Sequence, residues 1–258
     1  GYEAFHGCAS LTDVTIPDSV TSIGYEAFHG CASLTDVTIP DSVTSIGVGI
    51  FSGCTSLTEI VVDSNNKSYT SKNGILFDKN LETIICYPGG KSGNFTIPDS
   101  VTSIGDSAFQ NCTSLTDVTI PDSVTSIGGS AFYDCTSLTD VTIPDSVTSI
   151  GTYAFYNCTS LTDVTIPDSV ISIEYDTFGW CTSLTNVKIP DSVASIGDDA
   201  FKGCTSLTTV MIPTSVTSIG DFAFYSCNKL TDIYYKGTES KWNEISIGDS
   251  AIPSNVTI

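Results

Sequence analysis

The sequence contains no arginine. All nine basic residues are lysines, and the 29 Asp and Glu residues give the 258-residue chain a formal net charge of −20. Such an acidic chain is repelled by phosphate backbones, so nucleic acid is not an expected partner. The chain also has no cluster of basic residues that would hold an anionic membrane surface.

Long apolar stretches and uniquely placed histidines are missing as well. No run of about 18 apolar residues is present, so we expect no membrane insertion. The only two histidines, His6 and His29, occupy the same position in two identical repeats. Because catalytic dyads and triads need a uniquely placed base, the sequence predicts no enzyme and no cofactor.

What the sequence has in abundance is repetition. Residues 1–23 are identical to residues 24–46, and the phrase LTDVTIPDSVTSIG recurs with small changes up to Gly220. A phenylalanine and, three residues later, a cysteine return every 23 residues, with one longer interval before the fourth cysteine. These cysteines are Cys8, Cys31, Cys54, Cys112, Cys135, Cys158, Cys181, Cys204 and Cys227. A period this short indicates a stack of coils.

The residues of one repeat predict two short strands and a turn. Within residues 11–16, Val14 and Ile16 alternate with Asp13 and Thr15, which is typical of a strand with one buried side. The proline that follows ends this strand, and the next Asp-Ser pair favours a turn. Residues 20–23 form a second short apolar pair, and residues 27–31 fit one helical or 3-10 turn.

A coil of 23 residues buries too few apolar side chains to offset its loss of backbone entropy, so the coils must stack. We therefore expect one solenoid domain over residues 1–258. Its fold should be mostly β, with a parallel ladder on the LTDVTIP segments and a weaker ladder on VTSIG. Short helical or 3-10 turns are expected at AFxxC.

Two segments depart from the repeat. Residues 62–94 are longer, and residues 75–85 predict a β-hairpin with a two-residue turn at Lys79-Asn80. Residues 230–258 predict a C-terminal capping coil. This coil should hold a strand at 230–235, a short helix at 238–245 and a last strand at 255–258.

The LTDVTIPDSVTSIGxxAFxxCTS repeat resembles the BspA-like leucine-rich repeats of bacterial and protist surface proteins. YTSKNGILFDKNLETIICYPGGK is similar to the longer variant repeat of that family, and IYYKGTESKWNEISI looks like its C-terminal coil. The resemblance implies a leucine-rich-repeat solenoid on a secreted or cell-surface protein that binds proteins or mediates adhesion. The alternative is a structural spacer that projects another domain. The native signal and anchor are expected outside this sequence, which opens in mid-repeat.

The cysteines lack the paired CxxC spacing of zinc sites. Stacked cysteines have Cα atoms about 5 Å apart, but their parallel Cβ vectors keep the sulfur atoms from pairing. We therefore expect buried free thiols that act as small apolar side chains.

Acidic residues form two columns. The column in the turn after proline favours Asx turns, in which the carboxylate accepts local backbone N–H groups. The column on the strand face has no such local use, and like charges about 5 Å apart repel. A Ca²⁺ ion bridging their oxygen atoms would remove this repulsion. A Ca²⁺-stabilised surface repeat protein is therefore a second alternative, with candidate ligands Asp117, Asp140 and Asp163.

The best candidate for a binding surface is the outward strand column near the C-terminus. Threonine dominates this column earlier in the chain, whereas Lys188, Met211 and Tyr234 follow there, with Tyr235 adjacent. Large varied side chains favour protein interfaces, so we expect a protein or a host or matrix surface as partner. Aromatic residues near the spine phenylalanines either pack between coils or form a second contact surface. End-to-end self-association through the first coil is a further expectation.

Overall fold

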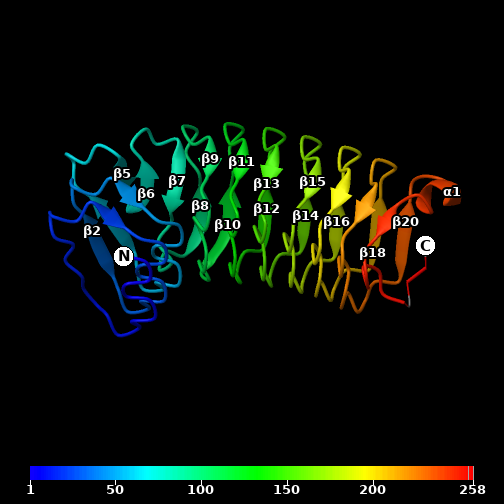
Figure 1. Ribbon diagram of the computed structural model, residues 1–258, viewed down its shortest axis with the longest axis horizontal. Coiled ribbons are helices and arrows are strands. Elements are labelled where there is room, and N and C mark those ends of the chain that lie inside the picture. The colour runs from blue at the N-terminus through cyan, green and yellow to red at the C-terminus, as the bar shows by residue number, and fades with distance from the viewer. Residues whose placement is uncertain (255, 258) are drawn as a thin grey trace.

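Each repeat folds into one coil, and successive coils lie side by side along a long, gently bent rod (Figure 1). The structure is a computed structural model that describes residues 1–254 and 256–257. The first coils lie at one end of the rod and the last coil at the other. The predicted mostly β parallel solenoid is confirmed.

The LTDVTIP segments form the main parallel ladder. Its register joins equivalent residues of successive repeats, such as Asp117 with Asp140 and Val118 with Val141. Near the N-terminus β2 (Asp36–Ile39) pairs with β4 (Glu59–Val62). The seven-stranded part contains β8 (Gly93–Thr96), β10 (Leu115–Thr119), β12 (Asp140–Thr142), β14 (Asp163–Thr165), β16 (Asn186–Lys188), β18 (Thr209–Ile212) and β20 (Asp232–Tyr235).

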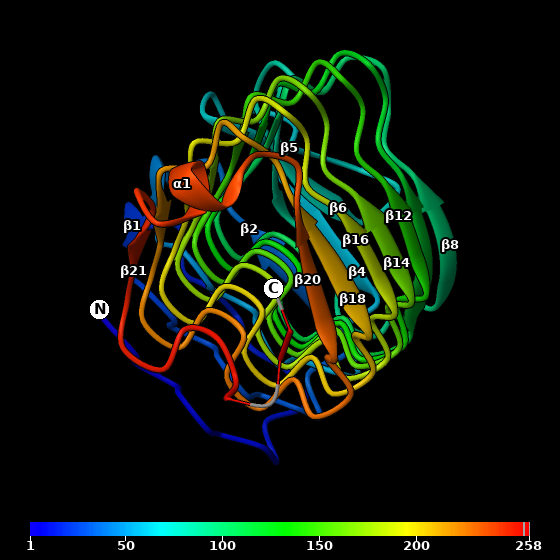
Figure 2. The same cartoon turned by 90° about the vertical axis from the view of Figure 1, so that its right-hand side faces the viewer.

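The VTSIG segments form the expected second ladder from strands of two residues. Viewed along the stack, the main ladder forms one wall and the short strands lie on the opposite side (Figure 2). The pieces are β1 (Ser22–Ile23) with β3 (Ser45–Ile46); β9 (Ser103–Ile104), β11 (Ser126–Ile127) and β13 (Ser149–Ile150), which continue from β7 (Thr83–Cys86); and β15 (Ser172–Ile173), β17 (Ser195–Ile196), β19 (Ser218–Ile219) and β21 (Ser246–Ile247).

A phenylalanine spine fills the core. The rings of Phe132 and Phe155 stack at 5.1 Å between centroids with 4° between their planes, and Phe201 and Phe224 stack at 5.4 Å. Tyr87 occupies the spine position in the irregular segment and stacks on the next phenylalanine at 5.1 Å. The repeat therefore places one aromatic ring per coil where it contacts the equivalent ring of its neighbour.

The cysteines form a second buried column. All ten are free, and all except Cys8 are buried. The Cys135 Sγ donates to the Phe109 carbonyl of the preceding coil at 3.1 Å, and the Cys158 Sγ donates to the Phe132 carbonyl at 3.2 Å. The prediction of buried free thiols is confirmed for every repeat cysteine except Cys8, and hydrogen bonds such as these show that a repeat thiol also links two coils.

The AFxxC segments make the expected single turns but do not extend into helices. In one coil the Cys158 N–H donates to the Phe155 carbonyl at 3.3 Å, an i to i+3 bond. Tyr153 and Asn157 flank this turn with φ of 58° and 56°. Left-handed residues interrupt a right-handed helix, so the Phe155 N–H bonds instead to the Thr177 carbonyl of the next coil at 2.9 Å.

The irregular segment corrects the predicted hairpin. β6 (Ile75–Asp78) and β7 (Thr83–Cys86) are antiparallel as expected, but four residues separate them instead of two. The two-residue turn is Asn73-Gly74, which joins β5 (Tyr69–Lys72) to β6. Their φ values of 54° and 77° suit a tight hairpin turn, and the Asn-Gly pair is the signal that the prediction missed.

The C-terminal coil closes the stack. The helix α1 (Glu239–Trp242) is shorter than the predicted 238–245, and the Thr238 side chain caps its start. Of the predicted strand at 255–258, Asn255 and Ile258 lie outside the described residues, and Thr257 pairs with Asp232 in a parallel bridge. Within the described residues, no helix has the length and apolar character needed to cross a membrane.

Candidate binding surface

The predicted patch residues come together on the outer face of the main ladder. Lys188 pairs with Met211, and Met211 pairs with Tyr234. All three side chains point outward, each directly after a buried residue of its strand, and Met211 and Tyr234 are 51% and 55% exposed. We call Lys188, Met211 and Tyr234 the sheet-face patch. The same column carries Thr119, Thr142 and Thr165 in earlier coils.

Tyr235, the fourth predicted residue, does not point outward with the other three. It pairs with Ile212 on the inward side of the ladder and is half-buried. Its ring lies 5.4 Å from the Trp242 ring in an edge-to-face arrangement. Tyr235 therefore packs the capping helix against the last strand, and it lines a surface hollow together with Tyr234 and Trp242.

A second hollow lies on the other side of the patch. Lys188 and Met211 line it together with Asp168, Asp191 and Lys236. The Lys236 Nζ and the Asp191 Oδ1 form an ion pair at 2.6 Å on its rim. The sheet-face patch is thus an apolar and basic area between two hollows, bordered by carboxylates.

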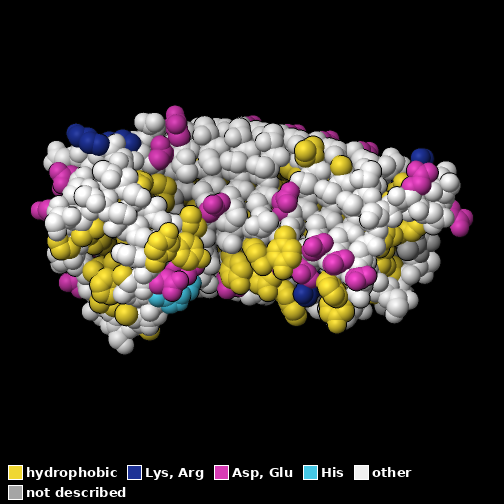
Figure 3. All heavy atoms as spheres, viewed as in Figure 1, with side chains coloured by type: hydrophobic (Ala, Val, Ile, Leu, Met, Phe, Trp, Pro, Cys, Tyr) yellow, Lys and Arg dark blue, Asp and Glu magenta, His cyan; other side chains and the backbone are white. Residues whose placement is uncertain are grey.

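The aromatic residues of the turn side lie in contact with one another. Tyr133 stacks on Tyr156 at 4.8 Å, and Tyr153 meets Tyr175 edge to face at 5.1 Å. Figure 3 shows hydrophobic side chains along the lower part of this face with acidic side chains among them. These contacts support the expectation of packing between coils, although Tyr175 remains 39% exposed.

A buried carboxyl lies beneath this aromatic group. Asp176 is buried, and its burial and, to a smaller degree, the nearby Asp199 carboxylate raise its pKa from 3.8 to about 6. The Lys202 Nζ lies 2.9 Å from the Asp199 Oδ1 and 5.7 Å from the Phe222 ring centroid. The Lys202 ammonium group therefore lies near the Phe222 ring, and the Asp176 carboxyl lies near the Tyr175 side chain.

The acidic column in the turns does not form the expected Asx turns. In the described chain, the turn carboxylates from Asp18 to Asp191 accept no backbone N–H, so the Asx-turn prediction is wrong. From Asp41 onward the serine after the aspartate bonds instead, as when the Ser123 Oγ donates to the Val101 carbonyl at 2.6 Å. On the strand face Asp117 and Asp140 are register neighbours, and Asn186 donates to Asp163. Calcium binding by this column stays a prediction.

Two further features lie near the N-terminus. An apolar hollow there is lined by residues that include Phe5, Val14 and Ile16, and the expected end-to-end association through this coil stays a prediction. The structure also brings His6 and His29 together with Glu26, a grouping that sequence reasoning did not single out. The identity of the first two repeats could have predicted this grouping, because residues at equivalent positions of adjacent coils become neighbours.

The family model described as the BspA type leucine-rich repeat region matches residues 1–89, 85–181 and 148–257. This chain belongs to the BspA-type leucine-rich repeat family. Its three matched ranges together extend over nearly the whole BspA-type chain and include the irregular segment.

Solved structures of bacterial relatives agree with this assignment. The chain is similar to a leucine-rich cell surface protein from Faecalibacterium prausnitzii, at 37% identity and TM-score 0.68 over 93% of this chain and 57% of that one. It is also similar to a leucine-rich repeat protein from Eubacterium ventriosum, at 29% identity and TM-score 0.81 over 98% and 79% of the two chains.

The pneumococcal vaccine antigen PcpA shares the fold, at 24% identity and TM-score 0.68 over 99% of this chain and 58% of that one. The BspA-type chain thus spans little more than half of the Faecalibacterium protein and of PcpA. No curated protein matches it.

Proposed function

We propose that this chain is a non-enzymatic extracellular or cell-surface module that binds a protein partner through the sheet-face patch. The observation that carries the proposal is the change in one outward column from threonine to three large, exposed, adjacent side chains. Methionine and aromatic residues are enriched in interfaces. A relative described as a cell surface protein supports the location.

The surroundings of the patch support the same proposal. Hollows on either side would accept side chains of a partner, and the carboxylates of Asp168, Asp191 and Glu239 at their edges would pair with its cations. Interfaces commonly combine such an apolar centre with a polar rim. The net charge of −20 would speed association with a basic partner at low salt.

The test replaces Lys188, Met211 and Tyr234 together by threonine, the residue of this column in β12 and β14. Because all three side chains are exposed, the melting temperature should change by no more than about 2 °C. Binding to host cells or to purified matrix proteins that retain the wild-type chain should be lost. The matched control replaces Thr119, Thr142 and Thr165 by alanine and should bind normally. Undiminished binding by the threonine variant would refute the patch.

A spacer is the second candidate. One continuous core over residues 75–251 favours it, because such a core makes a stiff rod. A pure spacer would be retained by none of the cells or matrix proteins, and the wild-type chain and the threonine variant would then behave alike.

A further inference from the structure

We propose that His6, Glu26 and His29, with Glu3 beside them, form a site for one Zn²⁺ ion between the first two coils. One ring nitrogen from each histidine and one Glu26 oxygen all lie within 4.8 Å of one another. Imidazole nitrogen and carboxylate oxygen are both zinc ligands. Within the described residues, no other three His, Cys, Asp or Glu side chains come together in this way. The proposal is independent of the proposed function.

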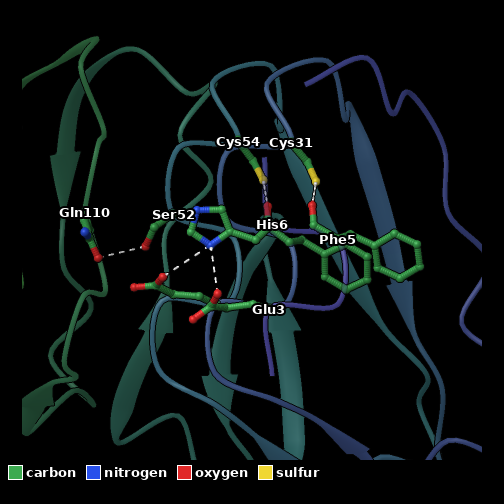
Figure 4. Close-up of polar contacts among 9 residues, drawn as sticks. Glu3, Phe5, His6, Cys31, Ser52, Cys54 and Gln110 are labelled. Atoms are coloured by element: carbon green, nitrogen blue, oxygen red, sulfur yellow. Dashed lines mark hydrogen bonds and ion pairs between the residues drawn. The ribbon is translucent and has the colours of Figure 1, made fainter. Parts of the chain in front are cut away.

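The exact repetition of residues 1–46 builds the donor set. It places the His29 ring against the His6 ring, with 4.6 Å between centroids and 28° between planes. It also places a glutamate three residues before each histidine. The His6 Nδ1 lies 3.9 Å from the Glu3 Oε2 and 3.6 Å from the Glu26 Oε2, so two coils contribute carboxylates to one imidazole (Figure 4).

His29 supplies an independent observation. Its Nδ1 is buried and has no hydrogen-bond partner. The repeat explains this, because Gly49 stands in the third coil where a further glutamate would follow Glu3 and Glu26. A buried polar atom without a partner is destabilising, and a ligated cation would satisfy it.

The third coil ends the donor column. Ser52 takes the position of the histidines, and its hydroxyl bonds to the Gln110 Oε1 at 3.0 Å (Figure 4). Ligands thus come from two coils only, and we expect one ion per chain. The ion would fasten the first coil, whose side chains are mostly exposed, to the second.

The distances are compatible with zinc after small side-chain rotations. Zinc bonds of about 2.0–2.1 Å in a tetrahedron put ligand atoms roughly 3.3–3.4 Å apart. The His6–Glu26 distance is already 3.6 Å. The side chains of His6 and Glu3 are 42% and 58% exposed, so they are free to close the remaining gap. Calcium would fit poorly, because it prefers six to eight oxygen ligands.

The test uses the full chain with Cys8 replaced by serine, which removes the one exposed thiol. Because the chain has only two histidines, a long-range ¹H–¹⁵N spectrum contains two imidazole systems. Titration with ZnCl₂ at pH 7.5 should shift the ring nitrogens of both and saturate at one equivalent. Millimolar Ca²⁺ should leave the zinc-bound spectrum unchanged.

Calorimetric titration of variants separates this site from diffuse binding by surface carboxylates. His6→Ala or His29→Ala should weaken zinc binding at least tenfold, and Glu26→Gln should weaken it several-fold. The matched control, Glu59→Gln, removes an exposed glutamate one coil further on and should bind zinc unchanged. Unshifted imidazole resonances at ten equivalents of zinc, or equal affinity in the His6→Ala, His29→Ala double variant, would overturn the proposal.

Discussion

At the scale of single residues, the repeat gives one side chain the same surroundings many times. Cysteine shows the consequence, because each buried thiol of the 23-residue register bonds to an aromatic residue's carbonyl in the preceding coil, as Cys135 and Cys158 do. Burial raises the pKa of the Cys54 and Cys181 thiols to about 12. These thiols remain protonated at neutral pH, so they are poor nucleophiles.

Thiol labelling should therefore separate Cys8 from the other nine cysteines. A thiol-specific reagent at pH 8 should modify one thiol per native chain quickly and all ten in denaturant. Cys8→Ser should abolish the fast reaction. Fast modification of several thiols in the native chain would contradict the packing described above.

Asp176 should make stability depend on pH. Its pKa of about 6 in the folded chain lies above the ordinary 3.8, because burial disfavours the charged form. The folded state therefore binds the proton more tightly, and this stabilisation, complete below about pH 4, is lost as the pH rises through 6.

Asp176→Asn should consequently raise the melting temperature at pH 7.5 by on the order of 2–4 °C, equivalent to about 1 kcal/mol. The difference should vanish near pH 4. Asp145→Asn, at an exposed turn position, serves as the control and should show no such pH dependence. A pH-independent difference for Asp176→Asn would argue against the buried-carboxyl explanation.

At the scale of elements, periodic positions could be predicted and irregular ones could not. Val118 and Ile120 alternate with polar residues, so the strand and its buried side follow from the sequence. Tyr87 could not be placed in the spine, because the insertion before it breaks the register. The turn after β6 was misjudged because the Asp78 carboxylate accepts three backbone N–H groups, which holds a longer loop.

The Asn73-Gly74 turn should be sensitive to a side chain at Gly74. Its φ is +77°, and an added Cβ would lie 3.2 Å from the Thr58 carbonyl oxygen and 3.3 Å from the Glu59 Cα. Gly74→Ala should cost about 2–3 kcal/mol in urea unfolding, from backbone strain and crowding together.

Gly93→Ala is the matched control for Gly74→Ala. It has a similar φ of +83°, but a Cβ there would meet nothing within 4 Å. Its cost should be about 1 kcal/mol, from backbone strain alone. Equal costs for the two variants would show that crowding at Gly74 is unimportant.

At the scale of the whole molecule, stacking turns sequence columns into surfaces. The sheet-face patch could be predicted because outward strand positions are known once the register is known. The histidine and glutamate cluster is equally a product of register, but it requires the actual ring and carboxylate positions. The hollows beside the patch could not be predicted, because they depend on how Lys236 and α1 fold back beside the last strands.

The calcium prediction also belongs to the whole rod. An ion bridging the carboxylates of neighbouring coils would raise the melting temperature in millimolar Ca²⁺ and lower it again in EDTA. Asp140→Asn should then remove the shift. Sodium chloride at matched ionic strength controls for screening of the net charge. Superimposable curves in Ca²⁺ and EDTA would exclude the ion.

Hydrogen exchange of the chain bound to its partner surface tests the central claim most directly. The account predicts that binding slows amide exchange in the last coils, over β16, β18 and β20 and the loop to α1, and leaves β10 and β12 unchanged. Protection spread evenly along the ladder, or confined to the first coils, would contradict a binding site at the sheet-face patch.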